Sequence, residues 1–142
     1  MVEIINQQRK IKIETTIFQN FAEEAAHTIN KSKGVSFTVA FVSDRKMREL
    51  NKQFRAKNST TDVLSFPFEA DEFDLDDNHL GDIIVSIEQA QKQADENDLP
   101  LELEIKQLIL HGVLHLCGYD HETDDGAMNR RELLLREHLK IG

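Results

Sequence analysis

The sequence is poor in the residues that cross-link or interrupt a fold. It has one cysteine, Cys117, so no disulfide can form within the chain, which suits a reducing compartment. It has two prolines, six glycines and no tryptophan, and no proline-, glycine- or serine-rich stretch that would mark a linker. With 142 residues and no internal repeat, the chain is expected to form a single domain, residues 1–142.

Long hydrophobic runs are also missing. The longest uncharged run, residues 107–119, has 13 residues, whereas a membrane-spanning helix needs about 20. Near the N-terminus, Glu3, Arg9, Lys10 and Lys12 interrupt the apolar positions, so no secretory signal is recognisable there. The sequence therefore predicts a soluble, cytoplasmic protein without a membrane partner.

The sequence has fewer basic than acidic residues. The formal net charge of −9 argues at first against a nucleic-acid partner. However, six acidic residues fall within 69–77, and the rest of the chain carries a net −3. Residues 44–57, by contrast, carry six basic and two acidic side chains, a local +4. Because such a run is typical of any solvated helix face, charge alone neither predicts nor excludes an RNA partner.

Hydrophobic periodicity predicts strands and helices in loose alternation. Period-2 patterns and short apolar runs predict strands over residues 2–5, 35–41, 63–68 and 80–87. Helical spacing predicts helices over about 17–34, 44–54, 90–94, 101–117 and from 124 onwards. Asp44 is the expected N-cap of the second helix, Pro100 opens the long one, and Pro67 marks a sheet edge or strand end. This order predicts helices packed on a sheet and leaves the topology open.

The strongest chemical signal is a group of histidines at the end of the long apolar helix. His111 and His115 are four residues apart, so on a helix their imidazoles lie on one face. Gly118 can end the helix and turn the chain, which would bring in His121. Three neutral imidazoles suit zinc and leave a fourth position for water, as in catalytic sites. The pattern therefore predicts a zinc ion held by these three histidines.

Other candidate ligands fit less well. A histidine pair at this spacing can be a satisfied core pair, but an uncompensated imidazole is costly to bury in so apolar a helix. Cys117 lies about 200° around the helix from His115 and is expected to be an inert buried thiol. The acidic stretch begins like a calcium loop, but His79 and Val85 occupy the positions of the required glycine and glutamate. No glycine-rich nucleotide-binding motif occurs, so no nucleotide cofactor is predicted.

The residue after the first predicted ligand indicates which type of hydrolysis the predicted zinc site can catalyse. Zinc proteases of the H-E-x-x-H type carry a general base there, whereas this chain has Gly112. That counts against proteolysis and favours a reaction in which a metal and a cation stabilise charge on phosphorus. Arg55 is the candidate cation, because a guanidinium binds phosphate through two hydrogen bonds, although an exposed arginine is more often a plain surface residue.

At this point the sequence resembles a known family. Residues 111–121 resemble the H-G-x-L-H-L-x-G-Y-D-H signature of the YbeY endoribonucleases, the bacterial rRNA maturation factors. Residues 50–68 and 80–84 also look like stretches of that family, and the resemblance spans about residues 40–125 in the same order. It implies an α+β fold in which a small mixed sheet is flanked by helices. The metal would lie at one end of a cleft, at a helix C-terminus and the following turn.

The resemblance also implies a function. It implies zinc at His111, His115 and His121, a functional Arg55, and cleavage of single-stranded RNA in 3′-end maturation of small-subunit (16S) rRNA and in ribosome quality control. The ribosome or a ribosomal protein would be a partner. Asp120 is an added candidate for orienting a ligand imidazole, with turn capping as an equal alternative. Another metal-dependent hydrolase, such as a protease, and a ribosome-associated protein with a structural zinc remain alternatives.

Overall fold

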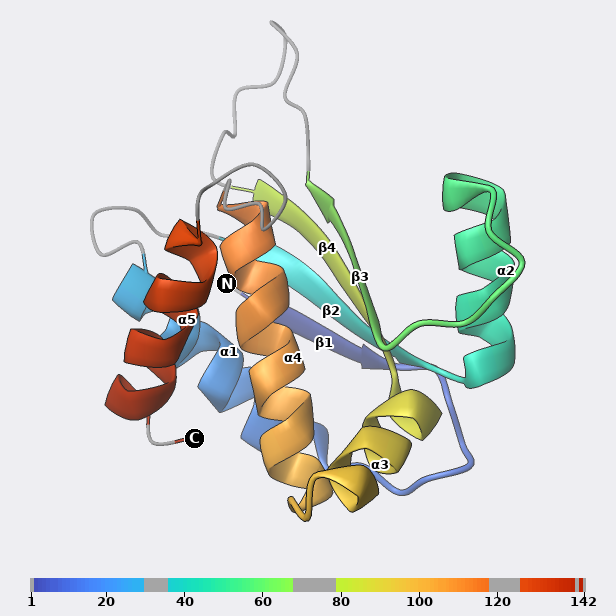
Figure 1. Ribbon diagram of the computed structural model, residues 1–142, viewed down its shortest axis with the longest axis horizontal. Coiled ribbons are helices and arrows are strands. Elements are labelled where there is room, and N and C mark those ends of the chain that lie inside the picture. Colours follow the sequence, from blue (N-terminus) through green and yellow to red (C-terminus); the bar gives the residue numbers. More distant parts are fainter. Residues whose placement is uncertain (1, 30–35, 68–78, 118–125, 140, 142) are drawn as a thin grey trace, which may run out of the picture.

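The computed structural model describes residues 2–29, 36–67, 79–117, 126–139 and 141. Within these ranges the chain forms β1 (Val2–Asn6), α1 (Thr15–Ile29), β2 (Ser36–Val42), α2 (Asp44–Arg55), β3 (Val63–Pro67), β4 (His79–Ser86), α3 (Ile87–Glu96), α4 (Leu101–Leu116) and α5 (Ala127–His138). Figure 1 shows these elements coloured along the sequence.

The strands form one mixed sheet in the order β1-β2-β4-β3. β2 pairs in parallel with β1 and β4, and β3 runs antiparallel to β4 at the edge. Pro67 is the last residue of this edge strand, as predicted, because a residue without an N–H would break the ladder of a central strand. A mixed sheet flanked by helices confirms the expected α+β class.

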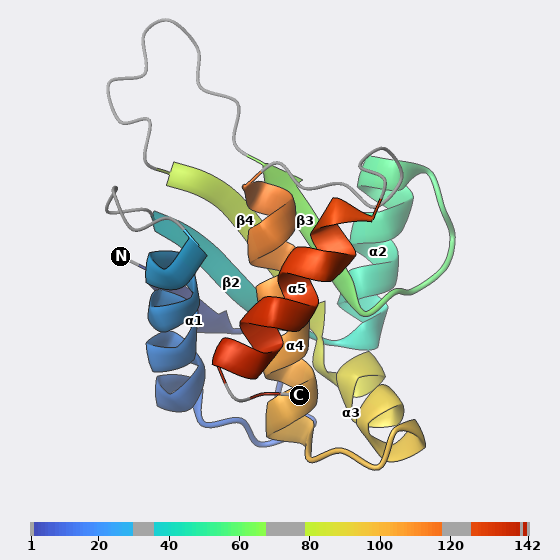
Figure 2. The ribbon, with the colours of Figure 1, turned by 60° about the vertical axis from the view of Figure 1, so that its left-hand side comes forward.

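The two faces of the sheet bury different cores. Val39 and Phe41 of β2 and Ile83 and Val85 of β4 belong to the large core that α1, α4 and α5 cover, and Phe41 meets Phe18 of α1 edge to face at 5.4 Å. Alternate residues of the same strands point to the opposite face, where a smaller core forms around Met47 of α2. Figures 1 and 2 show α4 and α2 on either side of β3.

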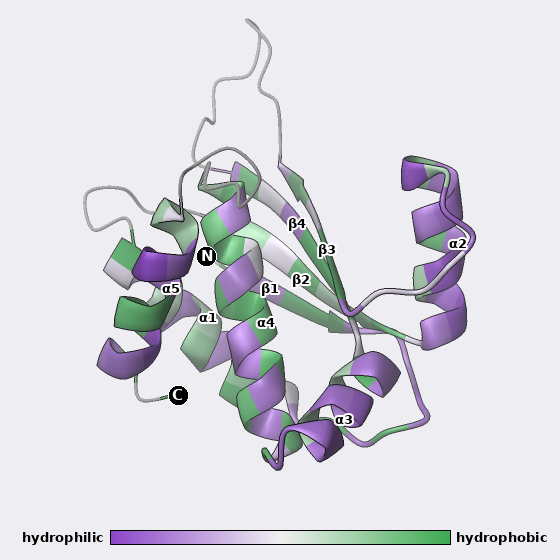
Figure 3. Ribbon diagram, viewed as in Figure 1, coloured by the Kyte–Doolittle hydropathy of each residue, from purple (hydrophilic) through white to green (hydrophobic). Residues whose placement is uncertain are grey.

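Hydropathy follows this arrangement. The strands and parts of α4 are hydrophobic, whereas α2 is mostly hydrophilic (Figure 3). No helix among the described residues is both long enough and apolar enough to cross a membrane. The helix predicted to end at Gly34 is described as far as Ile29, and Gly34 lies outside the described residues.

The prediction that Asp44 caps the second helix is wrong. Ser43 is the N-cap, since its hydroxyl accepts a hydrogen bond from the Lys46 N–H at 3.2 Å. The Asp44 carboxylate instead accepts hydrogen bonds from the side chains of Thr60, Ser86 and Gln89 at 2.6, 2.9 and 3.0 Å. Asp44 therefore ties the start of α2 to the segment before β3 and to α3.

Two other sequence expectations differ from the structure. Ile87, expected to end a strand, begins α3, because the Ser86 hydroxyl accepts from the Gln89 N–H at 3.3 Å and so caps that helix. The spacing of Met128, Leu134, Leu135 and Leu139 in the sequence predicts an apolar face for the last helix, but Leu134 is 63% exposed. The buried side of α5 is formed by Met128, Glu132 and Leu135.

Candidate metal centre

The last two turns of α4 bring the predicted histidine pair together. His111 and His115 lie on one face, with ring centroids 4.7 Å apart and their Nε2 atoms 3.2 Å apart. Two imidazole nitrogens bound to one tetrahedral ion at about 2.0–2.1 Å lie roughly 3.4 Å from each other. The spacing of the two Nε2 atoms therefore fits a single ion shared by the pair.

A carboxylate from α5 holds the first histidine. The Oε1 atom of Glu132 lies 2.7 Å from His111 Nδ1, and its Oε2 atom lies 2.6 Å from Arg136 Nη2. The Glu132 side chain is 7% exposed. Because an ionised carboxylate only accepts hydrogen bonds, this contact places the proton on Nδ1 and turns Nε2 toward His115. A carboxylate behind a ligand imidazole is the usual support of a protein metal site.

Sequence reasoning missed Glu132, although the sequence carries a signal for it. Residues 128, 132 and 135 are spaced i, i+4 and i+7, and the first and third of these are the buried Met128 and Leu135. A lone acid on the buried face of a helix needs a partner inside the protein. The signal does not identify that partner, which lies on a different helix.

The third predicted ligand is not tested. His121, together with Asp120 and Gly118, lies outside the described residues. Among the residues that the structure does describe, no group of three or more histidine, cysteine, aspartate or glutamate side chains could hold a metal. The two described imidazoles fit a zinc ion by their chemistry and spacing, and closure of the site depends on residues beyond them.

The packing of α4 against the sheet explains why residue 112 is a glycine. A Cβ atom at this position would lie 2.9 Å from Ile83 Cγ2 and 3.0 Å from Ile83 Cδ1. Residue 112 therefore faces the sheet, and it is glycine because α4 approaches β4 closely there. A glutamate at this position would point into the core instead of toward the histidine pair, so the base of a zinc protease has no place here.

Cys117 behaves as a packed thiol. It follows α4 directly and packs against the large core. Burial raises the pKa of its thiol above the usual value of 9.0. Its place in the core, rather than on the helix face of the histidine pair, is consistent with the inert buried thiol expected from the sequence.

Arg55 lies apart from the histidine pair. It is the exposed last residue of α2, on the sheet face opposite α4, and it makes no hydrogen bond or ion pair with the described residues. Its neighbour Phe54 packs against Phe66 of β3, with ring centroids 5.3 Å apart. The C-terminal ends of α2 and α4 point the same way, with β3 between them (Figure 1). Arg55 thus stands at the same end of the sheet as the pair, across its edge.

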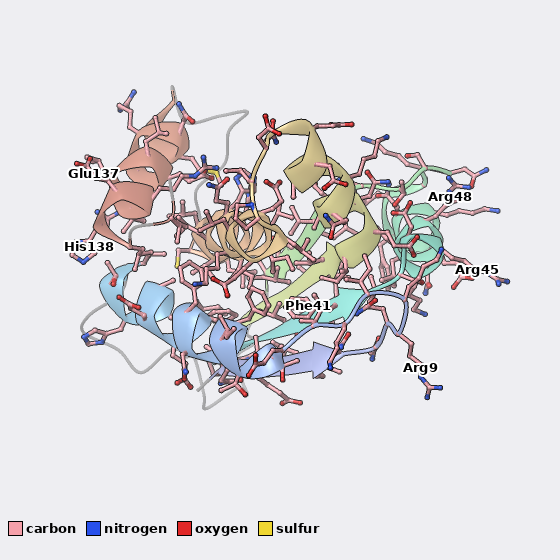
Figure 4. The ribbon with its side chains drawn as sticks, turned by 90° about the horizontal axis from the view of Figure 1, so that it is seen from below. Arg9, Phe41, Arg45, Arg48, Glu137 and His138 are labelled. Atoms are coloured by element: carbon pink, nitrogen blue, oxygen red, sulfur yellow. The ribbon has the colours of Figure 1, made fainter. Side chains whose placement is uncertain are left out.

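The basic residues of α2 are exposed. Arg45 and Arg48 extend outward from this helix, whereas Phe41 lies inside the protein (Figure 4). Lys52, Arg55 and Lys57 are exposed as well. The local charge of +4 therefore faces solvent, where a polyanion can reach it.

Comparison with known proteins identifies similar chains. Residues 3–140 match the family model described as Endoribonuclease YbeY. A relative of that name from Syntrophomonas wolfei is 41% identical over 140 residues, which cover 92% of this chain and 90% of the relative. Another from Nautilia profundicola is 51% identical over 89 residues, 63% of this chain and 61% of the relative. The solution structure of TM1509 from Thermotoga maritima matches with a TM-score of 0.69 at 29% identity, over 98% of this chain and 89% of that one.

Proposed function

Because this chain belongs to the YbeY endoribonuclease family, whose members are hydrolases, we propose that it is a zinc-dependent enzyme specific for single-stranded RNA. Its proposed role is 3′-end maturation of small-subunit (16S) rRNA and ribosome quality control. Residues 1–142 would form one catalytic domain that acts in the cytoplasm on an rRNA precursor. The ribosome or a ribosomal protein would be its partner. The family is one of endoribonucleases. This membership argues against the two alternatives, a protease-like hydrolase and a non-enzymatic protein with a structural zinc.

The observation that carries the metal-dependent part is the convergence of two Nε2 atoms, 3.2 Å apart, at the end of α4. His111 and His115 would hold the zinc together with His121, which follows α4 in the sequence. When bound, zinc supplies positive charge that polarises the scissile phosphate and makes water more acidic. Glu132 keeps the His111 proton on Nδ1, so that Nε2 is available as a ligand.

The chain's own cations would bind the substrate backbone. Arg55 would meet a phosphate oxygen through its guanidinium, which forms paired hydrogen bonds that a lysine cannot reproduce. Lys52 and Lys57, exposed beside it, would hold neighbouring phosphates. Because the chain as a whole carries −9, we expect free RNA to bind weakly and a protein on the ribosome to deliver the strand.

The first test measures metal content and cleavage together. Purified protein should contain about one zinc per chain and cut a labelled single-stranded RNA, but neither duplex RNA nor casein, and a chelator should stop the cleavage. His115→Ala should lose both zinc and activity. His138→Ala is the matched control, because His138 is exposed on α5 and points away from the protein (Figure 4). Cleavage that persists in His115→Ala would refute the zinc mechanism, and cleavage of casein would favour a protease.

A second test separates Arg55 from the metal. Arg55→Ala should have the zinc content and the melting temperature of the wild type, but its kcat should be at least 10-fold lower. Arg55→Lys should recover part of the lost kcat. Arg45→Ala, an exposed change on the same helix, should have kcat near wild type. Wild-type kcat in Arg55→Ala would remove Arg55 from the mechanism.

A third test of the proposed role in rRNA maturation uses ribosomal particles as the substrate. Small-subunit particles carrying an extended rRNA 3′ end should be trimmed by the wild type and not by His115→Ala. The same precursor RNA without its proteins should be cut more slowly, if a ribosomal partner delivers the strand. Equal rates on particles and free RNA would argue against such a partner.

A further inference from the structure

A cavity of about 600 Å³ lies beside α4 and includes His111, the first residue of the histidine pair, in its lining. Glu132 and Glu104 also line it. Glu104 and His111 are seven residues apart, so they share one face of α4 at a separation of roughly 10 Å along the helix axis. A nucleoside attached to a phosphate at the histidine pair could bridge that distance.

Glu104 is a buried acid without a hydrogen-bond partner in the described part of the chain. It is 6% exposed and makes no hydrogen bond or ion pair with the residues that the structure describes. Its burial and, to a smaller extent, the charge of nearby Asp62 raise its pKa above the usual value, although the positive charge of Arg136 acts in the opposite direction. A carboxyl group that lines a cavity without a donor from the protein takes its hydrogen bonds from water or from a ligand in that cavity. Its place in the cavity wall therefore points to a ligand that supplies hydrogen-bond donors.

The rest of the lining defines the chemistry of that ligand. Four carboxamides line the cavity: Gln93 and Asn97 from α3 and its C-cap, Gln107 of α4, which already donates to the Ile141 carbonyl, and Asn129 of α5. Apolar surface comes from Val63, Leu99 and Leu108. Arg136 is the one lysine or arginine in the described lining, and its guanidinium is bound to Glu132. Carboxylates and carboxamides can bind the edge of a nucleobase, and an apolar wall suits its face. A phosphate, in contrast, would be repelled by Asp62 and Glu104, which line the cavity in addition to Glu132.

We propose that this cavity binds a nucleobase with an exocyclic amino group, on a nucleotide close to the scissile phosphate, and that Glu104 accepts a hydrogen bond from the amino group. The assignment rests on the proposed ribonuclease function. A carboxylate pairs with the N4 amino group of cytosine, while uracil presents a carbonyl oxygen at the same place. The cavity thus gives the enzyme a base preference at one substrate position, against uridine.

The test uses substrates that differ by one base. Zinc-loaded protein is given single-stranded oligouridylate and otherwise identical strands with one cytidine at successive positions. Wild type should cut at a constant distance from the cytidine, with kcat/KM at least 10-fold above that for oligouridylate. In Glu104→Gln that ratio should fall to about 1, because a carboxamide also offers a donor to the uracil oxygen. Glu102→Gln, an exposed change in the same helical turn, should keep the wild-type ratio.

The outcomes separate this proposal from the function on which it rests. Zinc-dependent cleavage without any cytidine preference would overturn the base site and leave the ribonuclease standing. A preference that persists in Glu104→Gln would overturn the role of Glu104. Absence of zinc-dependent RNA cleavage would overturn the proposed function itself. The base site would then be judged by titrating cytidine and uridine monophosphate into the zinc-loaded protein, where equal affinities would overturn it.

Discussion

At the scale of single residues, the candidate metal centre depends on contacts that hold its imidazoles in place. His111 is fixed from one side by Glu132 and lies against His115 on the other. Glu132 is in turn held by Arg136 on the same helix. An imidazole whose orientation is set by a buried carboxylate loses little further freedom when it binds a metal, which raises metal affinity.

Glu132→Gln tests this support. A carboxamide is a weaker acceptor than a carboxylate, so zinc affinity should fall by about 10- to 100-fold, as measured by competition with a chromophoric chelator. Nitrogen NMR of the zinc-free protein should show the His111 proton on Nδ1 in wild type and a mixture of tautomers in Glu132→Ala. Glu137→Gln, on the exposed side of α5 (Figure 4), should change neither quantity. An unchanged zinc affinity in Glu132→Gln would remove Glu132 from the site.

Gly112→Ala tests the close approach of α4 to the sheet. The new Cβ would lie within 3.0 Å of the Ile83 side chain, so unfolding free energy should fall by about 1–3 kcal/mol. Helix propensity alone predicts the opposite sign, a gain of about 1 kcal/mol. Urea denaturation decides between them. In an Ile83→Ala background the penalty should disappear, and an equal penalty there would show that steric contact with Ile83 is not its cause.

At the scale of elements, side-chain hydrogen bonds tie the first turn of α2 to the rest of the protein, in addition to the packing of Met47. Asp44 accepts three side-chain hydrogen bonds, from Thr60 before β3, from Ser86 at the end of β4 and from Gln89 of α3. Burial alone would raise the Asp44 pKa, but the hydrogen bonds from Thr60, Gln89 and Ser86, with the charge of Arg48, outweigh it and lower the pKa below 3.8. The ionised form of Asp44 therefore anchors the helix that carries Arg55.

Asp44→Asn should destabilise the protein in a pH-dependent way. Since the pKa of the folded state lies below that of the unfolded state, the ionised carboxylate contributes stability above about pH 4. That contribution is lost as the pH falls through the folded pKa. Denaturation at pH 7 should show a deficit of about 1–2 kcal/mol for the variant, shrinking below pH 4. The exposed Asp82→Asn should stay within about 0.5 kcal/mol throughout, and a deficit for Asp44→Asn that is constant down to pH 2 would contradict the mechanism.

At the scale of the whole molecule, charge and catalytic chemistry lie on different parts of the surface. The protein carries −9, while the exposed residues of α2 and the segment after it carry a local +4. The histidine pair and its cavity lie on the opposite face of the sheet, on α4. A single strand that contacts both must pass around the β3 edge, which a stiff duplex does less easily than a flexible strand.

RNA binding should therefore depend weakly on salt. If Lys52, Arg55 and Lys57 neutralise three phosphates, the slope of log affinity against log salt should be about −2. Lys52→Gln and Lys57→Gln should each reduce its magnitude by about 0.7 and weaken all sequences alike. Lys92→Gln, an exposed change on α3, serves as the control. A slope unchanged by both lysine variants would place the RNA elsewhere on the protein.

Features that depend on neighbouring residues were predictable from the sequence alone. The packing of helices on a sheet, the edge position of Pro67, the long helix after Pro100 and the shared face of His111 and His115 follow from local spacing and backbone geometry, whereas the α+β class was implied by the family resemblance. The resemblance of residues 111–121 to YbeY endoribonucleases is confirmed by the family match over residues 3–140. His121 stays a prediction, because it lies outside the described residues.

Only the tertiary structure decided which distant residues meet. It brings Glu132 of α5 to His111, Ile83 of β4 to Gly112, and Ser86 and Gln89 to Asp44. It also places Arg55 and the histidine pair on opposite faces of the sheet. The reason is physical: helix and strand periods determine which residues of one element share a face, whereas contacts between elements depend on how those faces pack together over the whole core.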